Sequence, residues 1–187
     1  MIIYIHGFGS SGQANKAKIF REYFKSINQN FIAPSLSYVP NLAISTLEEI
    51  IDSYNEEIYL IGSSLGGYYA TYLSLNEKVK KVVLINPAVI PSHTLQKSVG
   101  DAINFYDNSS YKWNKEHLNM LHTYNTTKIE KNKFMVLLQK GDKVLNYKDA
   151  LTKYNGSTLM LEDAGDHGFK GIQNHFKNIL NFIEKDN

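Results

Sequence analysis

Cysteine is absent from this 187-residue sequence, proline occurs four times and tryptophan once. Without cysteine the chain can form no disulfide, no thiolate nucleophile and no cysteine-ligated zinc site. Its stability must come from core packing, which suits a reducing compartment. No apolar run approaches the roughly 18 residues needed to cross a bilayer, and the N-terminus lacks the features of a signal peptide. We therefore expect a cytoplasmic location and no membrane partner.

The charges are almost balanced, with 20 basic and 18 acidic residues and a net charge of +2. This balance gives no electrostatic reason to expect nucleic acid or an anionic membrane as a partner. Hydrophobic residues make up 43% of the chain, which is ordinary for a globular domain. We expect residues 1–187 to form a single domain. No cofactor is expected, because neither cysteine ligands nor paired histidines indicate a metal site.

Short apolar runs alternate with amphipathic segments along most of the sequence. The expected strands are 2–5, 31–33, 58–61, 82–85, 134–138 and 158–161. The expected helices are 14–27, 44–54, 65–75, 147–153 and 171–184. Such alternation predicts a three-layer α/β fold, with a mostly or wholly parallel sheet of about six strands covered on both faces. Ligands of such sheets bind at the carboxyl ends of the strands.

Residues 92–128 interrupt this alternation. The segment is polar and rich in aromatic residues, and it separates the fourth expected strand from the fifth. We interpret it as a small cap-like insertion with one or two helices of its own, which shapes the pocket.

The strongest motif is the pentapeptide Gly62-Ser63-Ser64-Leu65-Gly66. It follows an apolar strand and opens an amphipathic helix, which is the context of a nucleophile elbow with Ser64 as the nucleophile. In this register Ser63 is not the nucleophile. The alternative is a glycine-rich turn without chemistry.

A serine hydroxyl needs a base to accept its proton. His167 lies in a polar loop after the last expected strand, where the base of this fold belongs; the alternative is a residue that caps the last helix. His6 is expected to support its loop through hydrogen bonds, and His175 to face solvent from the last helix. The other three histidines lie in the insertion and are expected at the surface or at helix caps: His93, His117 and His122.

The acid that orients the base is expected after the fifth strand, where Asp142 follows Gly141. A carboxylate there can accept a hydrogen bond from the imidazole and stabilise the imidazolium. Asp142 could instead be an ordinary turn residue. Asp163 and Asp166 are alternatives for the acid, but both lie very near His167 in sequence, so we favour Asp142.

Acyl transfer also needs an oxyanion hole, formed by two backbone N–H groups. Leu65, the residue after the nucleophile, supplies one at a helix N-terminus. Phe8, in the glycine-bearing loop after the first strand, supplies the other, and its ring is expected to line the acyl pocket.

The chain resembles the α/β-hydrolase superfamily and, within it, the small bacterial YqiA-like esterases. The stretches that carry this resemblance are Tyr4-Ile5-His6-Gly7-Phe8, Gly62-Ser63-Ser64-Leu65-Gly66-Gly67-Tyr68-Tyr69-Ala70, Asn86-Pro87-Ala88-Val89, Gly141-Asp142-Lys143-Val144-Leu145-Asn146-Tyr147 and Gly165-Asp166-His167. The resemblance implies a minimal α/β-hydrolase fold without the antiparallel strands that open larger relatives. It also implies an esterase for short acyl esters, with Ser64, Asp142 and His167 as its triad.

The leading hypothesis is hydrolysis of a small-molecule carboxylic ester through an acyl-serine intermediate. An acyl-thioesterase of the same fold is a close alternative. A carbon–carbon lyase or a transferase could reuse the same triad. A non-catalytic ligand-binding protein is a further alternative, against which the presence of all three triad residues argues. The sequence predicts neither the physiological substrate nor the oligomeric state.

Overall fold

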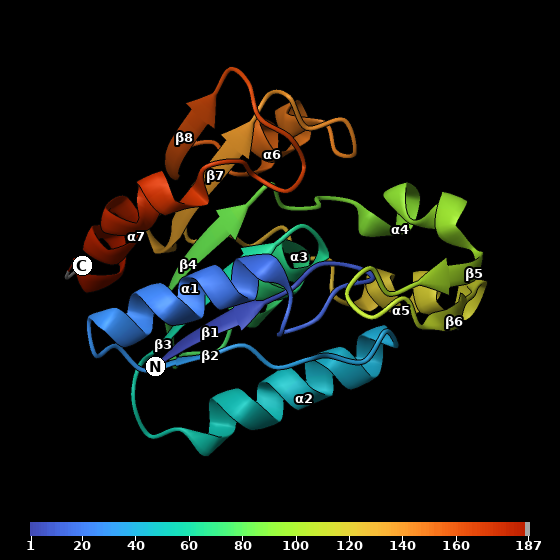
Figure 1. The fold of residues 1–187 in the computed structure, drawn as a ribbon, viewed down its shortest axis with the longest axis horizontal. Helices are drawn as coiled ribbons and strands as arrows, with labels where there is room; N and C mark the ends of the chain where they lie inside the picture. The colour runs from blue at the N-terminus through green and yellow to red at the C-terminus, as the bar shows by residue number, and fades with distance from the viewer. Residues whose placement is uncertain (186–187) are drawn as a thin grey trace.

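A six-stranded parallel sheet lies between layers of helices in the computed structural model, which describes residues 1–185 (Figure 1). The strand order is β2-β1-β3-β4-β7-β8, and every neighbouring pair in this sheet is parallel. The strands of the sheet are β1 (Ile2–Ile5), β2 (Phe31–Ile32), β3 (Ile58–Ser63), β4 (Val79–Ile85), β7 (Phe134–Gln139) and β8 (Thr158–Glu162). The expected three-layer fold and its wholly parallel sheet are thus confirmed.

The helices lie between the strands in sequence, except α7, which follows the last strand, and they cover both faces of the sheet. They are α1 (Asn15–Ser26), α2 (Pro40–Ser53), α3 (Leu65–Leu73), α4 (Pro91–Thr94), α5 (Lys115–Thr123), α6 (Tyr147–Lys153) and α7 (Phe176–Glu184), with 3₁₀ turns η1 (Gln96–Ser98), η2 (Lys131–Lys133) and η3 (Ile172–His175). Pro40 begins α2 four residues before the expected start. Proline is favoured at the first position of a helix, because its backbone lacks an N–H group and the first N–H groups of a helix have no intrahelical partner.

Two apolar clusters form the core, one on each face of the sheet. Helices α1 and α7 contribute to one cluster, and α2, α3 and α6 contribute to the other. Phe20 and Phe24 of α1 are fully buried, and the ring of Phe20 packs 5.0 Å from that of Phe176 in α7. The central strands are apolar on both sides because both faces are covered, which explains why they appear in the sequence as short continuous hydrophobic runs.

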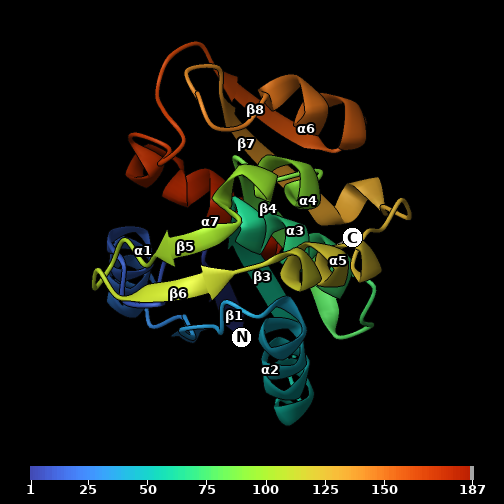
Figure 2. The same ribbon diagram turned by 90° about the vertical axis from the view of Figure 1, so that its right-hand side faces the viewer.

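The sequence predicted one or two helices in the insertion between β4 and β7, but the insertion also contains strands. It contains α4 and α5, but also an antiparallel hairpin of β5 (Gly100–Ile103) and β6 (Ser110–Trp113). These elements lie together at one end of the molecule (Figure 2). Trp113 is almost completely buried, and the centroid of its ring lies 4.9 Å from that of Phe8 in an edge-to-face arrangement. The hairpin therefore packs against the loop that follows β1.

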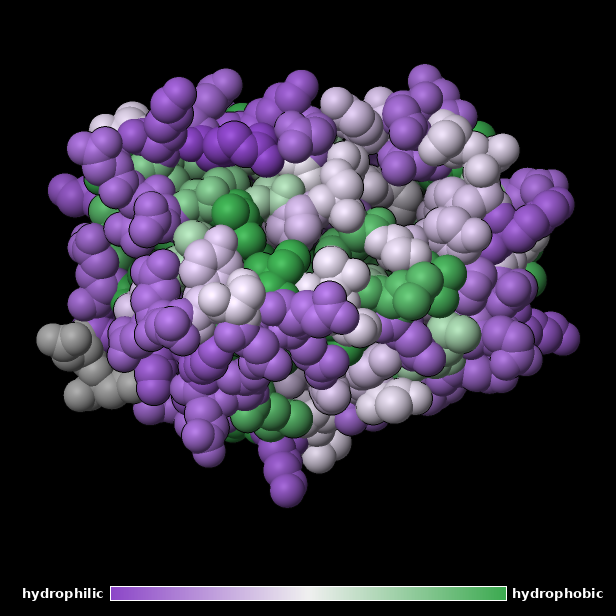
Figure 3. All heavy atoms as spheres, turned by 90° about the horizontal axis from the view of Figure 1, so that it is seen from below, coloured by the Kyte–Doolittle hydropathy of each residue, from purple (hydrophilic) through white to green (hydrophobic). Residues whose placement is uncertain are grey.

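The surface is mostly hydrophilic on the face drawn in Figure 3, with hydrophobic patches toward its middle. Among residues 1–185, no helix combines the length and the apolar character needed to cross a bilayer.

Candidate active site

Ser64 lies in a strained turn between β3 and α3. Its backbone angles are φ 54° and ψ −120°, a conformation that non-glycine residues rarely adopt. Such a conformation costs on the order of 1–3 kcal/mol and persists only where the surroundings enforce it. Glycine is required on both sides: a Cβ atom at Gly62 would lie 2.4 Å from the Gly66 carbonyl oxygen, and one at Gly66 would lie 2.0 Å from that of Ile5.

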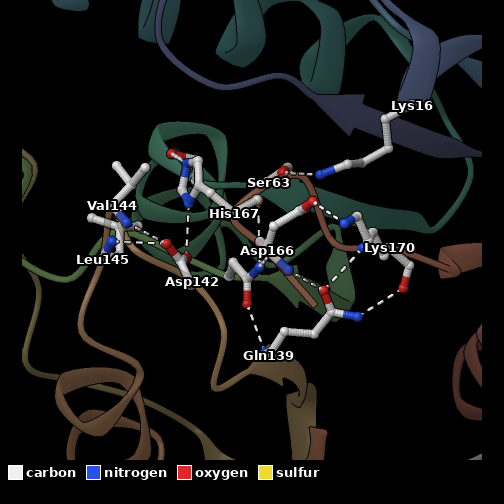
Figure 4. A network of polar contacts seen from close by, with 11 residues as sticks. Lys16, Ser63, Gln139, Asp142, Val144, Leu145, Asp166, His167 and Lys170 are labelled. Carbon is white, nitrogen blue, oxygen red and sulfur yellow. Dashed lines mark hydrogen bonds and ion pairs between the residues drawn. The ribbon is translucent and has the colours of Figure 1, made fainter. Parts of the chain in front are cut away.

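Three residues from distant parts of the chain are hydrogen-bonded in a row at the carboxyl ends of the strands. The Nε2 atom of His167 lies 3.0 Å from Ser64 Oγ, and its Nδ1 atom lies 2.8 Å from Asp142 Oδ2. His167 comes from the loop after β8, and Asp142 from the turn after β7; Figure 4 shows both side chains. The structure therefore brings together the three side chains that the sequence singled out.

Asp142 is held as an acceptor on both of its oxygens. While Oδ2 faces His167, Oδ1 accepts hydrogen bonds from the N–H groups of Val144 and Leu145, at 2.7 and 2.9 Å. Burial alone would raise the pKa of Asp142, but the hydrogen bonds from His167 and Leu145 outweigh it and hold the pKa below its ordinary value. The carboxylate is therefore ionised and can stabilise a positive charge on the imidazole.

The two alternative acids have other partners. Asp163 is paired with Lys140 and is 91% exposed. Asp166 lies 3.4 Å from the ammonium of Lys170. Within residues 1–185, the carboxylate that accepts a hydrogen bond from the His167 ring is that of Asp142.

Ser63 faces away from this row. Its Oγ atom accepts a hydrogen bond of 2.7 Å from the Nζ atom of Lys16 in α1, as Figure 4 shows. Neighbouring residues at the end of a strand point to opposite faces of the sheet, so Ser63 and Ser64 have separate partners. This geometry agrees with the register in which Ser64 is the central serine of the pentapeptide.

The loop after β1 passes directly beside Ser64. A Cβ atom at Gly7 would lie 3.1 Å from Ser64 Cβ and 3.6 Å from its Oγ. The next residue, Phe8, borders the same cavity as Ser64 and Leu65. Leu65 is the first residue of α3, where N–H groups lack helical partners and the helix dipole is positive. The assignment of the Phe8 and Leu65 N–H groups to an oxyanion hole remains a prediction.

An apolar cavity of about 260 Å³ opens over Ser64 and His167. It is bordered by residues of the β1 loop, the start of α3, the segment from the end of β4 into the insertion, and the turn after β7: Phe8, Leu65, Ala88, Pro91, Thr94, Leu95, Lys97, Ser98, Phe105, Val144 and Leu145. The insertion thus forms one wall of the cavity, as the sequence suggested.

His6 and His117 have structural roles, whereas His93 and His122 are exposed, as expected. His6 accepts a hydrogen bond at Nε2 from the Leu36 N–H, so its Nδ1 carries the proton and donates to the Gly7 carbonyl. Burial lowers the pKa of His6. Its predicted role as a support of the loop is confirmed. His117 caps α5 through a reciprocal pair of hydrogen bonds with Asn114.

The prediction that His175 faces solvent is wrong. The side chain is buried, and its Nε2 lies 2.8 Å from Glu162 Oε1. The expected continuous helix begins instead with the 3₁₀ turn η3, which has fewer residues per turn than an α-helix. His175 stands three residues after Ile172 and four before Ile179, both of which are buried, so it lies on the same inward side of this segment, where its ring is 5.5 Å from that of Phe169.

Two buried carboxamides near the site were not singled out from the sequence. Asn86, directly after β4, and Gln139, the last residue of β7, both hydrogen-bond to the loop that carries His167. The available signal was their position, because both are polar residues at the carboxyl ends of buried strands.

Comparisons with known proteins extend over nearly the whole chain. The model of a family described as "Uncharacterised protein family (UPF0227)" matches residues 1–184. A UPF0227 protein of Vibrio vulnificus is 26% identical over 191 residues, which cover 100% of both chains.

Solved structures share the fold at lower sequence identity. The alpha/beta hydrolase domain-containing protein 10 from mouse superposes with a TM-score of 0.76 at 19% identity, covering 98% of this chain and 88% of that one. Est1E from Butyrivibrio proteoclasticus, with ferulic acid bound, superposes with a TM-score of 0.73 at 14% identity, covering 97% and 87%. These likenesses identify the fold as that of the α/β hydrolases.

Proposed function

Since this chain belongs to the UPF0227 family and has an α/β-hydrolase fold, we propose that it is a serine hydrolase that cleaves small carboxylic esters. Ser64 is the nucleophile, His167 the general base and Asp142 the acid that orients the base.

One observation carries this proposal: Ser64 Oγ, the His167 ring and the Asp142 carboxylate are linked by contacts of 3.0 and 2.8 Å. These distances lie within the reach that proton transfer requires. Because Asp142 is ionised, it accepts a hydrogen bond from the Nδ1–H of His167, which leaves Nε2 free to accept a proton from Ser64. The strained backbone of Ser64 is a further support, since strain of this kind clusters at functional sites.

The reaction follows from this arrangement in two stages. Ser64 Oγ attacks the ester carbonyl carbon while its proton passes to His167 Nε2. The tetrahedral intermediate then collapses, and the leaving alcohol takes the proton from His167, so that an acyl-Ser64 ester remains. Water attacks this ester with His167 again accepting a proton, and the acid is released as Ser64 Oγ regains its hydrogen.

Negative charge develops on the carbonyl oxygen in both stages. We propose that the N–H groups of Phe8 and Leu65 donate hydrogen bonds to this oxygen, and the position of both residues at the border of the cavity that contains Ser64 supports this role. Loss of one such donor typically lowers kcat by about 10²–10³-fold.

The cavity over Ser64 supports a small substrate. Its volume of about 260 Å³ lies just below the roughly 300–1,000 Å³ of pockets that hold drug-sized ligands. Its walls are mainly apolar, which suits an acyl group rather than a charged one. The bound ferulic acid in Est1E is a carboxylic acid, the kind of product that ester hydrolysis releases, and this supports the same reaction class.

A fluorophosphonate probe tests the proposal directly, since it phosphonylates serines that a neighbouring base activates. We expect the wild-type protein to be labelled on the peptide that contains Ser64, and Ser64→Ala to remain unlabelled. Ser63→Ala is the matched control, because Ser63 is adjacent but hydrogen-bonds to Lys16, and it should still be labelled. A wild-type protein that resists the probe would favour a non-catalytic ligand-binding role.

Aryl esters and acyl-CoA thioesters with the same acyl groups then distinguish the two hydrolytic activities. We expect faster turnover of the small esters, because the cavity is small and apolar. Higher kcat/KM for the thioesters would instead assign the chain as an acyl-thioesterase.

A further inference from the structure

The loop that carries His167 has little packing of its own. Between residues 163 and 170, only Phe169 is buried. A loop with so few apolar contacts would be expected to move freely. His167 nevertheless has to stay within hydrogen-bond distance of both Ser64 and Asp142, so some other interaction must fix the backbone of this loop.

Asn86 provides part of that interaction. Its Nδ2 group donates hydrogen bonds to the carbonyl oxygens of Asp166 and His167, at 3.0 and 3.3 Å. The side chain is only 2% exposed. Hydrogen bonds in such a buried place are strong, and leaving one of their partners unpaired is costly.

Gln139 holds the same loop from a second side. Its Oε1 atom accepts hydrogen bonds from the N–H groups of Asp166 and Lys170, at 3.0 and 2.9 Å. Its Nε2 group donates to the Lys170 carbonyl at 2.7 Å and also to Glu162, and Figure 4 shows this side chain beneath the loop. The two carboxamides together bind five backbone groups of residues 166–170.

The two residues are also joined to each other. The backbone N–H of Gln139 donates to Asn86 Oδ1 at 3.0 Å, and the backbone N–H of Asn86 donates to the Leu137 carbonyl at 3.0 Å. Both residues therefore stand at the carboxyl ends of β4 and β7, which are paired in the middle of the sheet. The loop is thus tied to two interior strands of the sheet.

We propose that Asn86 and Gln139 are positioning residues: together they form a carboxamide clamp that fixes the His167 backbone so that its imidazole bridges Ser64 and Asp142. This inference rests on the proposed function, because it assigns the clamp a role in the same reaction. Neither side chain touches the reacting atoms. A displacement of about 1 Å in a catalytic group can lower the rate roughly 10²-fold, so loss of the clamp should reduce kcat much more than it raises KM.

Two substitutions at Asn86 separate hydrogen bonding from backbone conformation. Asn86 has φ 40°, which glycine adopts without strain, so Asn86→Gly removes the side chain while preserving the turn. Asn86→Asp keeps the shape and the acceptor for Gln139, and aspartate tolerates this φ. However, it places an oxygen against the two carbonyl groups that Nδ2 now binds. If the clamp acts through these donors, both variants should lose kcat by roughly 10²-fold.

Gln139 allows the same comparison from the other strand. Gln139→Glu retains an acceptor for the two N–H groups but loses both donors, and Gln139→Met fills a similar space without any strong hydrogen bond. The matched control is Asn76→Asp, in a turn beyond the C-terminal end of α3. There the Oδ1 atom accepts from the Lys78 N–H, and the substitution retains that bond. Urea denaturation of each variant establishes the conditions under which all of them are folded.

The clamp also has a readout that needs no substrate. The proton on His167 Nδ1, shared with Asp142, should give a downfield proton resonance in the wild-type protein, assigned by its loss in His167→Ala. We expect this resonance to broaden or disappear in Asn86→Gly, Asn86→Asp and Gln139→Met, and to remain in Asn76→Asp.

Folded clamp variants that keep both wild-type kcat and a sharp resonance would overturn the inference. A wild-type protein that shows this resonance but hydrolyses no ester would refute the proposed function alone, and the same variants would still test the clamp.

Discussion

The side chain of Gln139 lies directly against the backbone of Gly165. A Cβ atom at position 165 would lie 1.9 Å from Gln139 Oε1, and Gly165 has φ +90°. The absence of a side chain at 165 is therefore what allows Gln139 to reach the N–H groups of the His167 loop.

Gly165→Ala should consequently lower both stability and kcat. The left-handed backbone alone costs roughly 1–3 kcal/mol for a residue with a side chain, and the clash moves Gln139 away from the loop. Gly156→Ala is the matched control. Gly156 also has φ +90°, but a Cβ atom added there would lie 3.8 Å from the Cγ atom of Lys131, which is an ordinary contact. Urea denaturation should show a loss in both variants, and ester turnover should fall only in Gly165→Ala. Equal turnover in the two variants would contradict the role given to this contact.

The identity of the acid leads to a second prediction. Asp142→Asn should lower kcat by about 10⁴-fold, because an amide in place of the carboxylate favours the wrong tautomer of the base. Asp166→Asn should have a small effect, since the Asp166 carboxylate lies beside Lys170 rather than the imidazole. Steady-state hydrolysis of an aryl ester measures both variants. A larger loss in Asp166→Asn would reassign the acid.

Much of this arrangement could be predicted from the sequence. The pentapeptide around Ser64, the position of Asp142 after a strand and that of His167 after the last strand are local patterns with a fixed order in this fold. The strands were also recognisable, because burial on both faces makes them continuous apolar runs.

The parts that the sequence did not predict depend on contacts between distant residues. Asn86 and Gln139 act only because β4 and β7 are neighbours in the sheet, and a carboxamide at a strand end has no periodic pattern. The strands of the β5–β6 hairpin have four residues each, and so short an alternation as that of β6 does not stand out in a polar segment. His175 lies at helical spacing from the buried Ile172 and Ile179, but the contact with Glu162 of β8 that allows its polar ring to be buried there is not visible in the sequence.

Lys16 gives a third prediction, on pH and stability. Burial lowers the pKa of Lys16 from its ordinary value of 10.5 to about 8, although the charges of Asp166 and Asp142 oppose this shift. Between these two pH values the unfolded chain holds a proton on this lysine that the folded chain has released. The free energy of unfolding should therefore rise with pH across this window through this group.

Lys16→Met isolates the contribution. The difference in free energy of unfolding, wild type minus variant, should increase as the pH is raised from about 8 to 10.5, the interval between the two pKa values. All other titrating groups are common to both proteins, so the difference removes them. Urea denaturation at pH values on both sides of the window measures it. A difference that stays constant would show that Lys16 titrates at the same pH in the folded and unfolded chains.

Phe105 supports the last prediction, which concerns the acyl group. This residue is 77% exposed, yet it borders the cavity over Ser64. A substrate in the cavity would cover part of its ring, and fully burying an aromatic side chain of this size contributes about 1.5–3 kcal/mol. Phe105→Ala should therefore raise KM for esters with longer acyl chains by up to roughly tenfold. It should change acetyl esters little, because a short chain does not reach the rim.

The effect should appear in KM rather than in kcat, because Phe105 does not contact the reacting atoms. Stability should stay within about 0.5 kcal/mol of wild type, as is usual for exposed positions. Tyr106→Ala is the matched control, since it removes an exposed aromatic ring from the neighbouring residue, which does not border the cavity. Kinetics on a series of aryl esters of increasing acyl length test this. If Phe105→Ala and Tyr106→Ala gave the same dependence on chain length, the acyl group would have to bind elsewhere than in this cavity.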